Sequence, residues 1–437
     1  TVVGLDYDED QCLWTTRTSD GERVISRFVV AATGALSVPI EPDVPGVSDF
    51  DGEVLFTSRY PHEGVDLRGK RVGVIGTGSS GVQVISAIAP EVGLLCVFQR
   101  TATYSYPALN RKLRPGEMDR IKSEYPELRA RQRQHPAGTI GFGAVSFDFS
   151  NPPTRRILES TPEERLAAID EVGWKAPLDW ADVMIDMEAN GVAVELYAEL
   201  VSRVVTDPET ARRLSPKHPI GCRRTVLDTA YFETYNRDNV SLVDISESPW
   251  RVVRDGVEVG DRSYRLDVLI LATGFDAMTG ALNRIDIRGR GGRLLRDEWN
   301  DGPHTMLGIQ VHGFPNLFII GGPGSPSVLG NVVQSIELHV EWMADLLTTM
   351  AERGWASVDP THEAVEEWTD HVAEVGSRNV IRASAHCNTW YHGSNVPGKR
   401  RVFLPYAGGI PAFRARCEGI AAAGYTGFVF DRVSPTE

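Results

Sequence analysis

The sequence predicts an α/β protein, and three observations support this fold class. Residues 72–89 read VGVIGTGSSGVQVISAIA, in which a β-branched apolar run, a glycine-rich turn and a run with helical spacing follow one another. Two further apolar runs, at 28–34 and 267–274, each end in Ala-Thr-Gly. Between 110 and 216, apolar residues recur at helical spacing. Strands that alternate with helices favour a parallel sheet.

The glycine-rich turn has the spacing G-x-G-x-x-G between a predicted strand and a predicted helix. In this context Gly76 permits the tight turn, Gly78 lets a pyrophosphate approach the backbone, and Gly81 lets the helix pack closely on the strand. The helix N-terminus offers free N–H groups and a partial positive charge to phosphates. We therefore expect a dinucleotide site rather than a purely structural turn. Its candidate residues are Gly76, Thr77, Gly78, Ser79, Ser80, Gly81 and Gln83.

The next predicted strand, at 94–98, indicates which dinucleotide binds. An NAD site carries Asp or Glu near the end of this strand, where the carboxylate binds the ribose 2′-hydroxyl. Here the chain has Gln99, Arg100 and Thr101 instead. An arginine at this place suits a 2′-phosphate, so NADPH is favoured. The alternative is that Arg100 is only a solvated strand end.

Composition and charge argue against several classes of function. The 437 residues are 42% hydrophobic and 24% charged, which is ordinary for a globular protein of two or three domains. A net charge of −14 argues against nucleic acid and against an anionic membrane as the main partner. No apolar run nears the length that spans a bilayer and no signal peptide is recognisable, so a cytoplasmic location is expected. The histidines form no H-E-x-x-H motif and the five cysteines no C-x-x-C pair, so we expect neither a metal site nor a disulfide framework.

Local patterns predict further elements along the chain. The first residues read as hairpin strands with turns at 8–10 and 19–21, and because a domain rarely begins in the middle of a sheet, we expect that sequence upstream is missing. Thr161 and Glu164 form a capping box that opens a helix. Near the end, 316–322 predicts a buried strand and 335–350 an amphipathic helix.

Adjacent arginines, Arg223 and Arg224, stand just before a predicted strand. Two positive charges repel each other unless anions lie near, so this pair indicates either surface ion pairs or an anion site. The two Ala-Thr-Gly runs bracket the glycine-rich turn, so the segment between them is a candidate for a domain inserted into another sheet. The helical stretch within that segment could cover a cleft.

Several motifs occur in one order along the chain: the glycine-rich turn, Gln99-Arg100-Thr101, Arg223-Arg224, and then the runs YNRDN, LILATGFDA, GGPGSPS and NVPGKRR. In these motifs the chain resembles the type I Baeyer–Villiger monooxygenases of the flavin-containing monooxygenase superfamily, and most of all the phenylacetone and steroid monooxygenase group. The resemblance runs from Thr1 almost to the C-terminus. It implies two dinucleotide-binding, Rossmann-like domains, with the NADP domain inserted in the FAD domain, plus a helical insertion. The expected parts are 1–40 (FAD domain), 41–108 (NADP domain), 109–216 (helical insertion), 217–266 (NADP domain, second part) and 267–437 (FAD domain, C-terminal part).

The sequence departs from the family pattern in two places. On the order of a hundred N-terminal residues of that pattern are absent, and with them the first G-x-G-x-x-G, for FAD, and an active-site aspartate. A missing segment or a second chain is expected to carry that half. The family fingerprint F-x-G-x-x-x-H-x-x-x-W-P has Phe56 here for the histidine and Tyr60 for the tryptophan. Since this segment links the domains, the exchange concerns domain motion and coupling more than the chemistry.

The resemblance also implies the reaction and the role of each residue. NADPH reduces FAD, O2 adds to give a flavin peroxide, and the peroxide attacks a ketone so that one oxygen atom is inserted and an ester or lactone forms. Arg224 matches the arginine that stabilises the negative charge, because a guanidinium stays charged and donates from a planar fork. Arg223 would join Arg100 and Thr101 on the 2′-phosphate, and Trp390 would reach the nicotinamide side of the cofactor. The ketone pocket would be lined by Ser327, Val328, Leu329 and Val332.

Two other interpretations stay open. A related flavin enzyme would oxygenate nitrogen or sulfur, or act mainly as an NADPH oxidase. Arg224 favours the Baeyer–Villiger reaction, because soft heteroatoms attack the neutral hydroperoxide and have less need of a cation there. A non-catalytic NADP-binding fragment is the second alternative.

Overall fold

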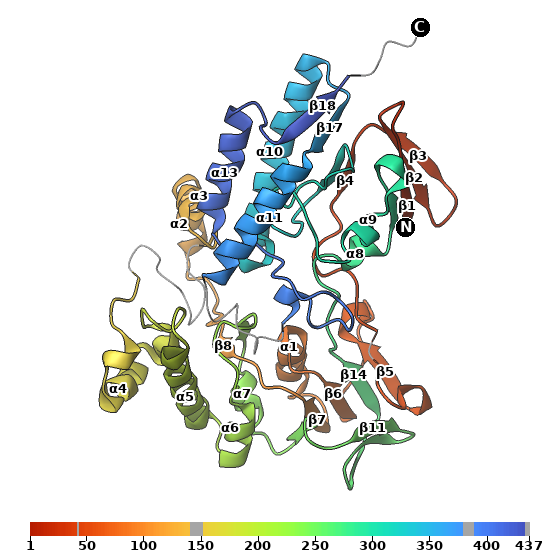
Figure 1. The fold of residues 1–437 in the computed structure, drawn as a ribbon. Coiled ribbons are helices and arrows are strands. Elements are labelled where there is room, and N and C mark those ends of the chain that lie inside the picture. Colours follow the sequence, from red (N-terminus) through yellow and green to blue (C-terminus); the bar gives the residue numbers. More distant parts are fainter. Residues whose placement is uncertain (42, 140–151, 379–388, 433–437) are drawn as a thin grey trace.

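The computed structural model describes residues 1–41, 43–139, 152–378 and 389–432. The lower half of the molecule in Figure 1 holds a five-stranded parallel sheet with the strand order β10-β7-β6-β14-β5. Its strands are β5 (Glu53–Phe56), β6 (Arg71–Ile75), β7 (Leu94–Gln99), β10 (Val240–Asp244) and β14 (Val268–Leu271). Helix α1 (Ser79–Ile88) connects β6 to β7. The predicted α/β class is confirmed.

Strands β6 and β7 form because their apolar, mostly β-branched or aromatic residues suit a strand that is covered on both faces. Val72, Val74 and Leu95 are completely buried in this sheet. Helix α1 contributes Val82 and Ile85 to the same core. The predicted strand, turn and helix are therefore all found at 71–88.

Strand β14 lies inside the sheet, between β6 and β5. Ile270 of β14 is opposite Val74 of β6 on one side and Leu55 of β5 on the other. The expected domain boundary between 266 and 267 would separate β14 from β5 and β6, the strands with which it pairs. The structure differs from this expectation. The chain leaves the sheet only after Leu271, at the Ala-Thr-Gly turn.

The helices between 109 and 216 form two groups. Helices α4 (Pro162–Val172), α5 (Met187–Val204) and α6 (Pro208–Leu214) share one core with the parallel sheet. The predicted capping box is confirmed, because Thr161 Oγ1 accepts a hydrogen bond from Glu164 N and the Glu164 carboxylate accepts one from Thr161 N. Helices α2 (Glu117–Ser123) and α3 (Tyr125–Gln134) lie instead beside α13 (Ile410–Ala422) in Figure 1, and Arg129 of α3 pairs with Glu337 at 2.7 Å.

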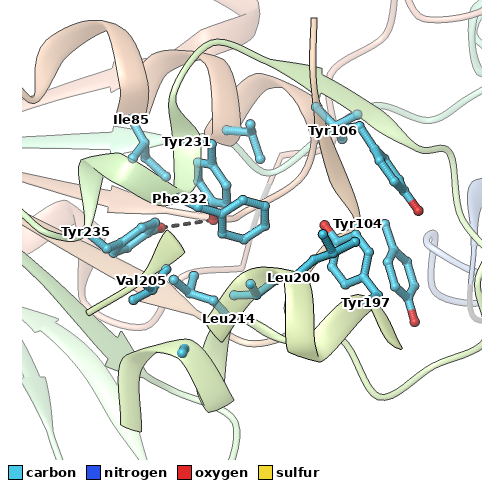
Figure 2. Close-up of a cluster of buried hydrophobic side chains, with 14 of the residues drawn as sticks. Ile85, Tyr104, Tyr106, Tyr197, Leu200, Val205, Leu214, Tyr231, Phe232 and Tyr235 are labelled. Atoms are coloured by element: carbon cyan, nitrogen blue, oxygen red, sulfur yellow. Dashed lines mark hydrogen bonds between the residues drawn. The ribbon is translucent and has the colours of Figure 1, made fainter. Parts of the chain in front are cut away.

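Aromatic side chains join α5 to the segment that follows β7 (Figure 2). The ring of Tyr197 meets Tyr104 edge-on at a centroid distance of 4.8 Å and Tyr106 at 5.4 Å. The Tyr197 hydroxyl also donates to Ser105 O at 2.7 Å. Phe232 of α7 (Tyr231–Thr234) packs against the same ring. These contacts fix the backbone that follows Arg100 and Thr101.

The upper half of Figure 1 carries the N-terminal strands and the long helices of the C-terminal part of the chain. The predicted N-terminal hairpins are confirmed as β1 (Val2–Asp8), β2 (Leu13–Thr18) and β3 (Arg23–Ser26), and β15 (Asp286–Arg288) adds parallel to β1. The predicted strand and helix near the end are also found, as β16 (Leu317–Ile319) and α10 (Val332–Arg353). Helices α10, α11 (His362–Ser377) and α13 (Ile410–Ala422) share a core with β16. The shorter elements are β4 (Val29–Ala31), β8 (Ser105–Pro107), β9 (Val226–Asp228), β11 (Trp250–Val253), β12 (Gly256–Val259), β13 (Arg262–Arg265), α8 (Gly280–Asn283), α9 (Leu295–Glu298), β17 (Ser357–Pro360) and β18 (Phe428–Asp431).

The run at 28–34 differs from the predicted buried strand. Only Val29–Ala31 form the strand β4, and the side chain of Val30 is 44% exposed. Among the described residues β4 pairs with β16 alone, so its second edge has no strand partner there. In β14, by contrast, every residue is buried because both faces of the strand are covered: Val268 and Ile270 pack into one core, and Leu269 and Leu271 into another.

The segments that follow the two Ala-Thr-Gly turns lie side by side between the halves of the molecule. Asp276 N donates to Val38 O at 2.9 Å, and Met278 N donates to Ala35 O at 2.8 Å. The chain therefore passes between the two halves of the molecule twice at the same place, at 35–38 and at 276–278. Within the described ranges, every helix is too short or too polar to reach across a bilayer.

Candidate functional site

The glycine-rich turn connects the carboxyl end of β6 to α1, and its glycines differ in their surroundings. Gly76 has φ +105°, a conformation that favours glycine, and a Cβ there would lie 2.5 Å from Ala272 O. A Cβ on Gly81 would collide with Gly76 O, so the helix can begin this close to β6 only with glycine at 81. No atom lies within 4 Å of the Cβ position of Gly78. The open space of this site is therefore next to Gly78.

The start of α1 is suited to an anion. Gly78 is the N-cap, no side chain caps the helix, and its first turn contains no acidic residue. The first intrahelical hydrogen bond runs from Val82 N to Gly78 O, so the earlier N–H groups have no partner within the helix. Thr77 is buried and its hydroxyl donates to Thr101 O at 2.8 Å, which ties the turn to the end of β7. The remaining candidates lie at the surface, Ser79 and Gln83 exposed and Ser80 half-buried.

The like charges of Arg100 and Arg223 act on each other near this site. Arg100 is exposed just after β7, whereas Arg223 is half-buried. Burial lowers the pKa of Arg223, and the like charge of Arg100 lowers this pKa further. Among the described residues, the buried Nε of Arg223 has no hydrogen-bond partner. A guanidinium in this position would be stabilised by an anion, so the anion-site interpretation of the arginine pair gains support.

Cys222 precedes this arginine pair and is disulfide-bonded. Cys12, Cys96 and Cys417 carry free, buried thiols. The sequence predicted no disulfide framework, so the disulfide bond at Cys222 is a difference from that expectation. Spacing along the chain does not reveal such a bond, because it depends on how far apart two Cα atoms lie in the fold.

Arg224 reaches the upper half of the molecule. Its Nη1 donates to Val328 O at 2.5 Å, across 104 positions of sequence. Val328 lies in a single turn of 3-10 helix, Ser327–Leu329, which follows the GGPGSPS motif. This contact brings together the predicted arginine and the predicted pocket lining.

An apolar cluster surrounds this contact. Its buried members are Ala277, Met278, Val328, Tyr391 and Leu404. Leu329 and Trp390 pack against its edge, and the rings of Trp390 and Tyr391 have centroids 4.4 Å apart. Trp390, Val328 and Leu329 thus belong to one cluster, beside Arg224.

Two predicted pocket residues are placed differently. Ser327 is buried, and its hydroxyl donates to Gly321 O at 3.3 Å, which holds the loop that precedes the turn. Val332 begins α10, is 42% exposed and lies outside the apolar cluster. The structure therefore brings Val328 and Leu329 to Arg224 but leaves Val332 at the surface.

No protein-family model matches the chain. Acetone monooxygenase (methyl acetate-forming) from Gordonia sp. strain TY-5 is 38% identical over 436 residues, which cover 98% of this chain and 79% of that protein. A Baeyer–Villiger monooxygenase from Pseudooceanicola batsensis is 36% identical over 442 residues, which cover 99% of this chain and 78% of that protein. The solved structure of an oxidised steroid monooxygenase bound to NADP matches with a TM-score of 0.89 and 41% identity, over 99% of this chain and 80% of that chain.

The chain belongs to the Baeyer–Villiger monooxygenases. The resemblance stated from the motifs is confirmed, and so is the Rossmann-like fold class. In this Baeyer–Villiger monooxygenase the described residues fit a dinucleotide at the glycine-rich turn, through the open space at Gly78, the uncapped start of α1 and the unpaired Nε of Arg223. At the two Ala-Thr-Gly turns, Gly34 and Gly274 both have positive φ and nothing within 4 Å of their Cβ positions, so these turns also leave open space.

The two exchanged fingerprint positions of this Baeyer–Villiger monooxygenase lie on the segment that leads from β5 to β6. The guanidinium of Arg59 lies over the ring of Phe56, 4.6 Å from its centroid, and pairs with Glu41 at 2.9 Å. Tyr60 packs on the core of the parallel sheet, and burial raises the pKa of its hydroxyl. A cation–π contact and apolar packing therefore hold this link in place of the family's histidine and tryptophan.

Sequence reasoning missed three residues of the site. Lys399 Nζ donates to Asp276 Oδ1 at 2.7 Å, and Asn395 Nδ2 donates to Phe275 O at 2.9 Å. Both contacts lie beside the apolar cluster. These residues do lie in motifs that the sequence analysis singled out, Asp276 in LILATGFDA and Asn395 and Lys399 in NVPGKRR. Neither motif indicates that the two stretches of chain are in contact.

His339 of α10 binds the loop at Gly321. Because this histidine is buried, we expect the stability of the protein to depend on pH. His339 is completely buried, accepts a hydrogen bond at Nδ1 from Gly321 N at 3.1 Å, and burial lowers its pKa to about 4. Since the unfolded value is near 6.5, the unfolded state binds more protons between these values, and stability falls as the pH drops from about 6.5 toward 4.

We expect the wild type to lose on the order of 2 kcal/mol more stability between pH 7 and pH 5 than the variant His339→Asn. Asparagine keeps an acceptor near Nδ1 but does not titrate. Urea unfolding at both pH values measures the difference. Equal losses in the two proteins would contradict this role of His339.

Proposed function

We propose that this Baeyer–Villiger monooxygenase binds NADPH and FAD and inserts one oxygen atom of O2 into a ketone, which gives an ester or a lactone. The observation that carries the proposal is the contact of Arg224 with Val328, because it sets a permanent cation at the edge of an apolar cluster. The relatives support the same reaction. One is named for forming methyl acetate, and the steroid monooxygenase structure contains NADP.

The FAD, when bound, supplies the activation of O2 and the transfer of the oxygen atom. The chain must bind FAD and NADPH, keep water out of the site and stabilise the negative charge that develops while the oxygen atom is inserted into the ketone. We assign the last task to Arg224. A guanidinium donates from a planar fork, and one edge of this one is already oriented by Val328 O.

The NADPH site is assigned to the glycine-rich turn and the residues after β7. The N–H groups at the start of α1 would bind the pyrophosphate next to Gly78. Arg100, Thr101 and Arg223 would bind the 2′-phosphate, whose charge would relieve the repulsion between the two arginines. Trp390 would contact the nicotinamide side, and its place in the apolar cluster supports this assignment.

The ketone site is assigned to the apolar cluster beside Arg224. Val328 and Leu329 offer only hydrocarbon surface, which suits an apolar ketone. Met278, also in this cluster, has a flexible side chain that adapts to ligands of different shape. The expected substrates are small molecules, and nucleic acid and membranes are not expected as partners.

The proposal is tested with the full-length protein purified with its flavin. Incubation with NADPH, ¹⁸O2 and a panel of ketones and thioethers is followed by mass spectrometry of the products. We expect esters or lactones that carry one ¹⁸O atom. Sulfoxides without any ester would favour the heteroatom oxygenase, and hydrogen peroxide as the sole product would favour the NADPH oxidase. A preparation that takes up no flavin would favour the non-catalytic fragment.

The choice of cofactor is tested separately by Arg100→Ala. We expect the preference for NADPH over NADH, as the ratio of kcat/KM, to fall roughly tenfold, because a charged hydrogen bond to the 2′-phosphate is lost. Arg251→Ala on β11 is the matched control, since this arginine is exposed and its ion pair in the described part of the chain is with Glu258 on the neighbouring strand. An unchanged preference in Arg100→Ala would rule out the assignment.

A cytoplasmic location remains a prediction from the sequence. It is tested by fractionation of the source cells and detection of the chain with an antibody. Recovery in the membrane or extracellular fraction would contradict it.

A further inference from the structure

The segment at 389–404 lies between the two halves of the molecule, near the centre of Figure 1. It begins next to Trp390, which packs on the apolar cluster, and ends with Leu404, a buried member of the same cluster. Leu404 is held on both sides, since Leu404 N donates to Tyr391 O at 2.8 Å and Leu404 O accepts from Gly324 N at 2.7 Å. The end of the segment is thus fixed by the upper half of the molecule.

The opposite side of the segment is fixed by charge. Lys399 Nζ lies 2.7 Å from Asp276 Oδ1 and also donates to Ala277 O at 3.0 Å. The two side chains are 16% and 24% exposed, and no other ion pair among the described residues keeps both partners below a quarter exposed. Asn395 adds its hydrogen bond to Phe275 O. The aliphatic part of Lys399 also lies close to Gly393, which folds the segment onto itself.

The partner of Lys399 is tied to the glycine-rich turn. Asp276 follows the Ala-Thr-Gly turn after β14, and Ala272 at the start of that turn places its carbonyl oxygen against Gly76. Backbone hydrogen bonds from Asp276 and Met278 to the 35–38 segment hold this stretch in place. The Lys399–Asp276 pair therefore joins the segment that carries Trp390 to a stretch of chain that contacts the glycine-rich turn.

We propose that Lys399 is a positioning residue, whose ion pair with Asp276 holds Trp390 in place for NADP(H). This inference rests on the proposed function, in which Trp390 contacts the nicotinamide side of the cofactor. Removal of the Lys399 ammonium leaves the half-buried carboxylate of Asp276 without its partner. The folded position of the segment is then less stable than one in which the segment moves away and water reaches the carboxylate. The cost of reordering the segment would then reduce the affinity for NADP(H).

The first experiment measures the segment without any cofactor chemistry. Amide hydrogen exchange of 389–404 is followed by mass spectrometry in the flavin-loaded protein free of NADP, in wild type, Lys399→Met, Lys399→Arg and Arg400→Met. Arg400→Met is the matched control, because Arg400 is the next residue, is 63% exposed and lies 3.8 Å from Asp301. We expect exchange to rise by roughly tenfold in Lys399→Met, to rise less in Lys399→Arg, and to stay unchanged in the control.

The second experiment measures the dissociation constant of NADP⁺ by calorimetry in the same proteins. We expect about a tenfold increase in Lys399→Met, partial recovery in Lys399→Arg, and no further increase when Lys399→Met is added to Trp390→Ala. Non-additivity of this kind distinguishes positioning of Trp390 from a general loss of stability, and Asp276→Asn should reproduce the effect.

The outcomes separate this inference from the proposed function. If wild type binds no NADP⁺, the proposed function fails, and exchange still decides whether the pair holds the segment. Unchanged exchange in Lys399→Met overturns the inference. So does faster exchange with an unchanged dissociation constant, or additivity with Trp390→Ala. If Lys399→Met does not fold, Asp276→Asn and Lys399→Arg carry the same two measurements.

Discussion

Arg224→Ala is expected to reduce the rate of ester formation by two to three orders of magnitude, because the positive charge assigned to the oxygen-insertion step is removed. Reduction of the flavin by NADPH should persist, since the assigned NADPH site uses Arg100, Thr101 and Arg223 instead. Gas chromatography of the ester measures the first quantity, and stopped-flow absorbance of the flavin under anaerobic conditions measures the second.

Two control variants sharpen this result. Arg224→Lys keeps the charge but loses the planar fork that donates to Val328 O, so we expect an intermediate rate. Arg100→Ala removes a neighbouring cation without touching the apolar cluster, so ester formation at saturating NADPH should be close to that of wild type. Ester formation at the wild-type rate in Arg224→Ala would contradict the role assigned to Arg224 in the oxygen-insertion step.

Gly78→Ala is expected to weaken NADP⁺ binding by about a hundredfold while the melting temperature stays within a few degrees of wild type. Gly78 has φ −77° and open space at its Cβ position, so alanine fits the protein without strain. The added methyl group occupies the space where the pyrophosphate would approach the backbone. Calorimetry and thermal unfolding of the same preparations give the two quantities.

Gly81→Ala provides the contrast, since its Cβ would collide with Gly76 O and displace α1. Both the affinity and the melting temperature should fall in this variant. If Gly78→Ala binds NADP⁺ as tightly as wild type, the pyrophosphate does not pass over this turn. If Gly78→Ala unfolds at a much lower temperature than wild type, alanine does not fit at position 78 without strain.

Local patterns in the sequence were enough to predict the elements that depend on neighbours along the chain. The strand, turn and helix at 71–88, the capping box at Thr161 and the amphipathic helix α10 are all found, because spacing of apolar residues and capping chemistry act within a few residues. The motif order also led to the Baeyer–Villiger monooxygenases, which the relatives confirm. Arg100, Arg223 and Arg224 were singled out in the same way, from unusual charge at the ends of predicted strands.

The tertiary structure alone decided which of these residues meet. The burial of β14 and the exposure of Val30 in β4 depend on which elements cover each face of the strand, which no single run of residues specifies. Likewise, Arg224 meets Val328 across 104 positions, and Lys399 meets Asp276 across 123. Contacts over such distances arise from packing of the whole chain, so the sequence supplied the chemical groups of the site and the fold supplied their partners.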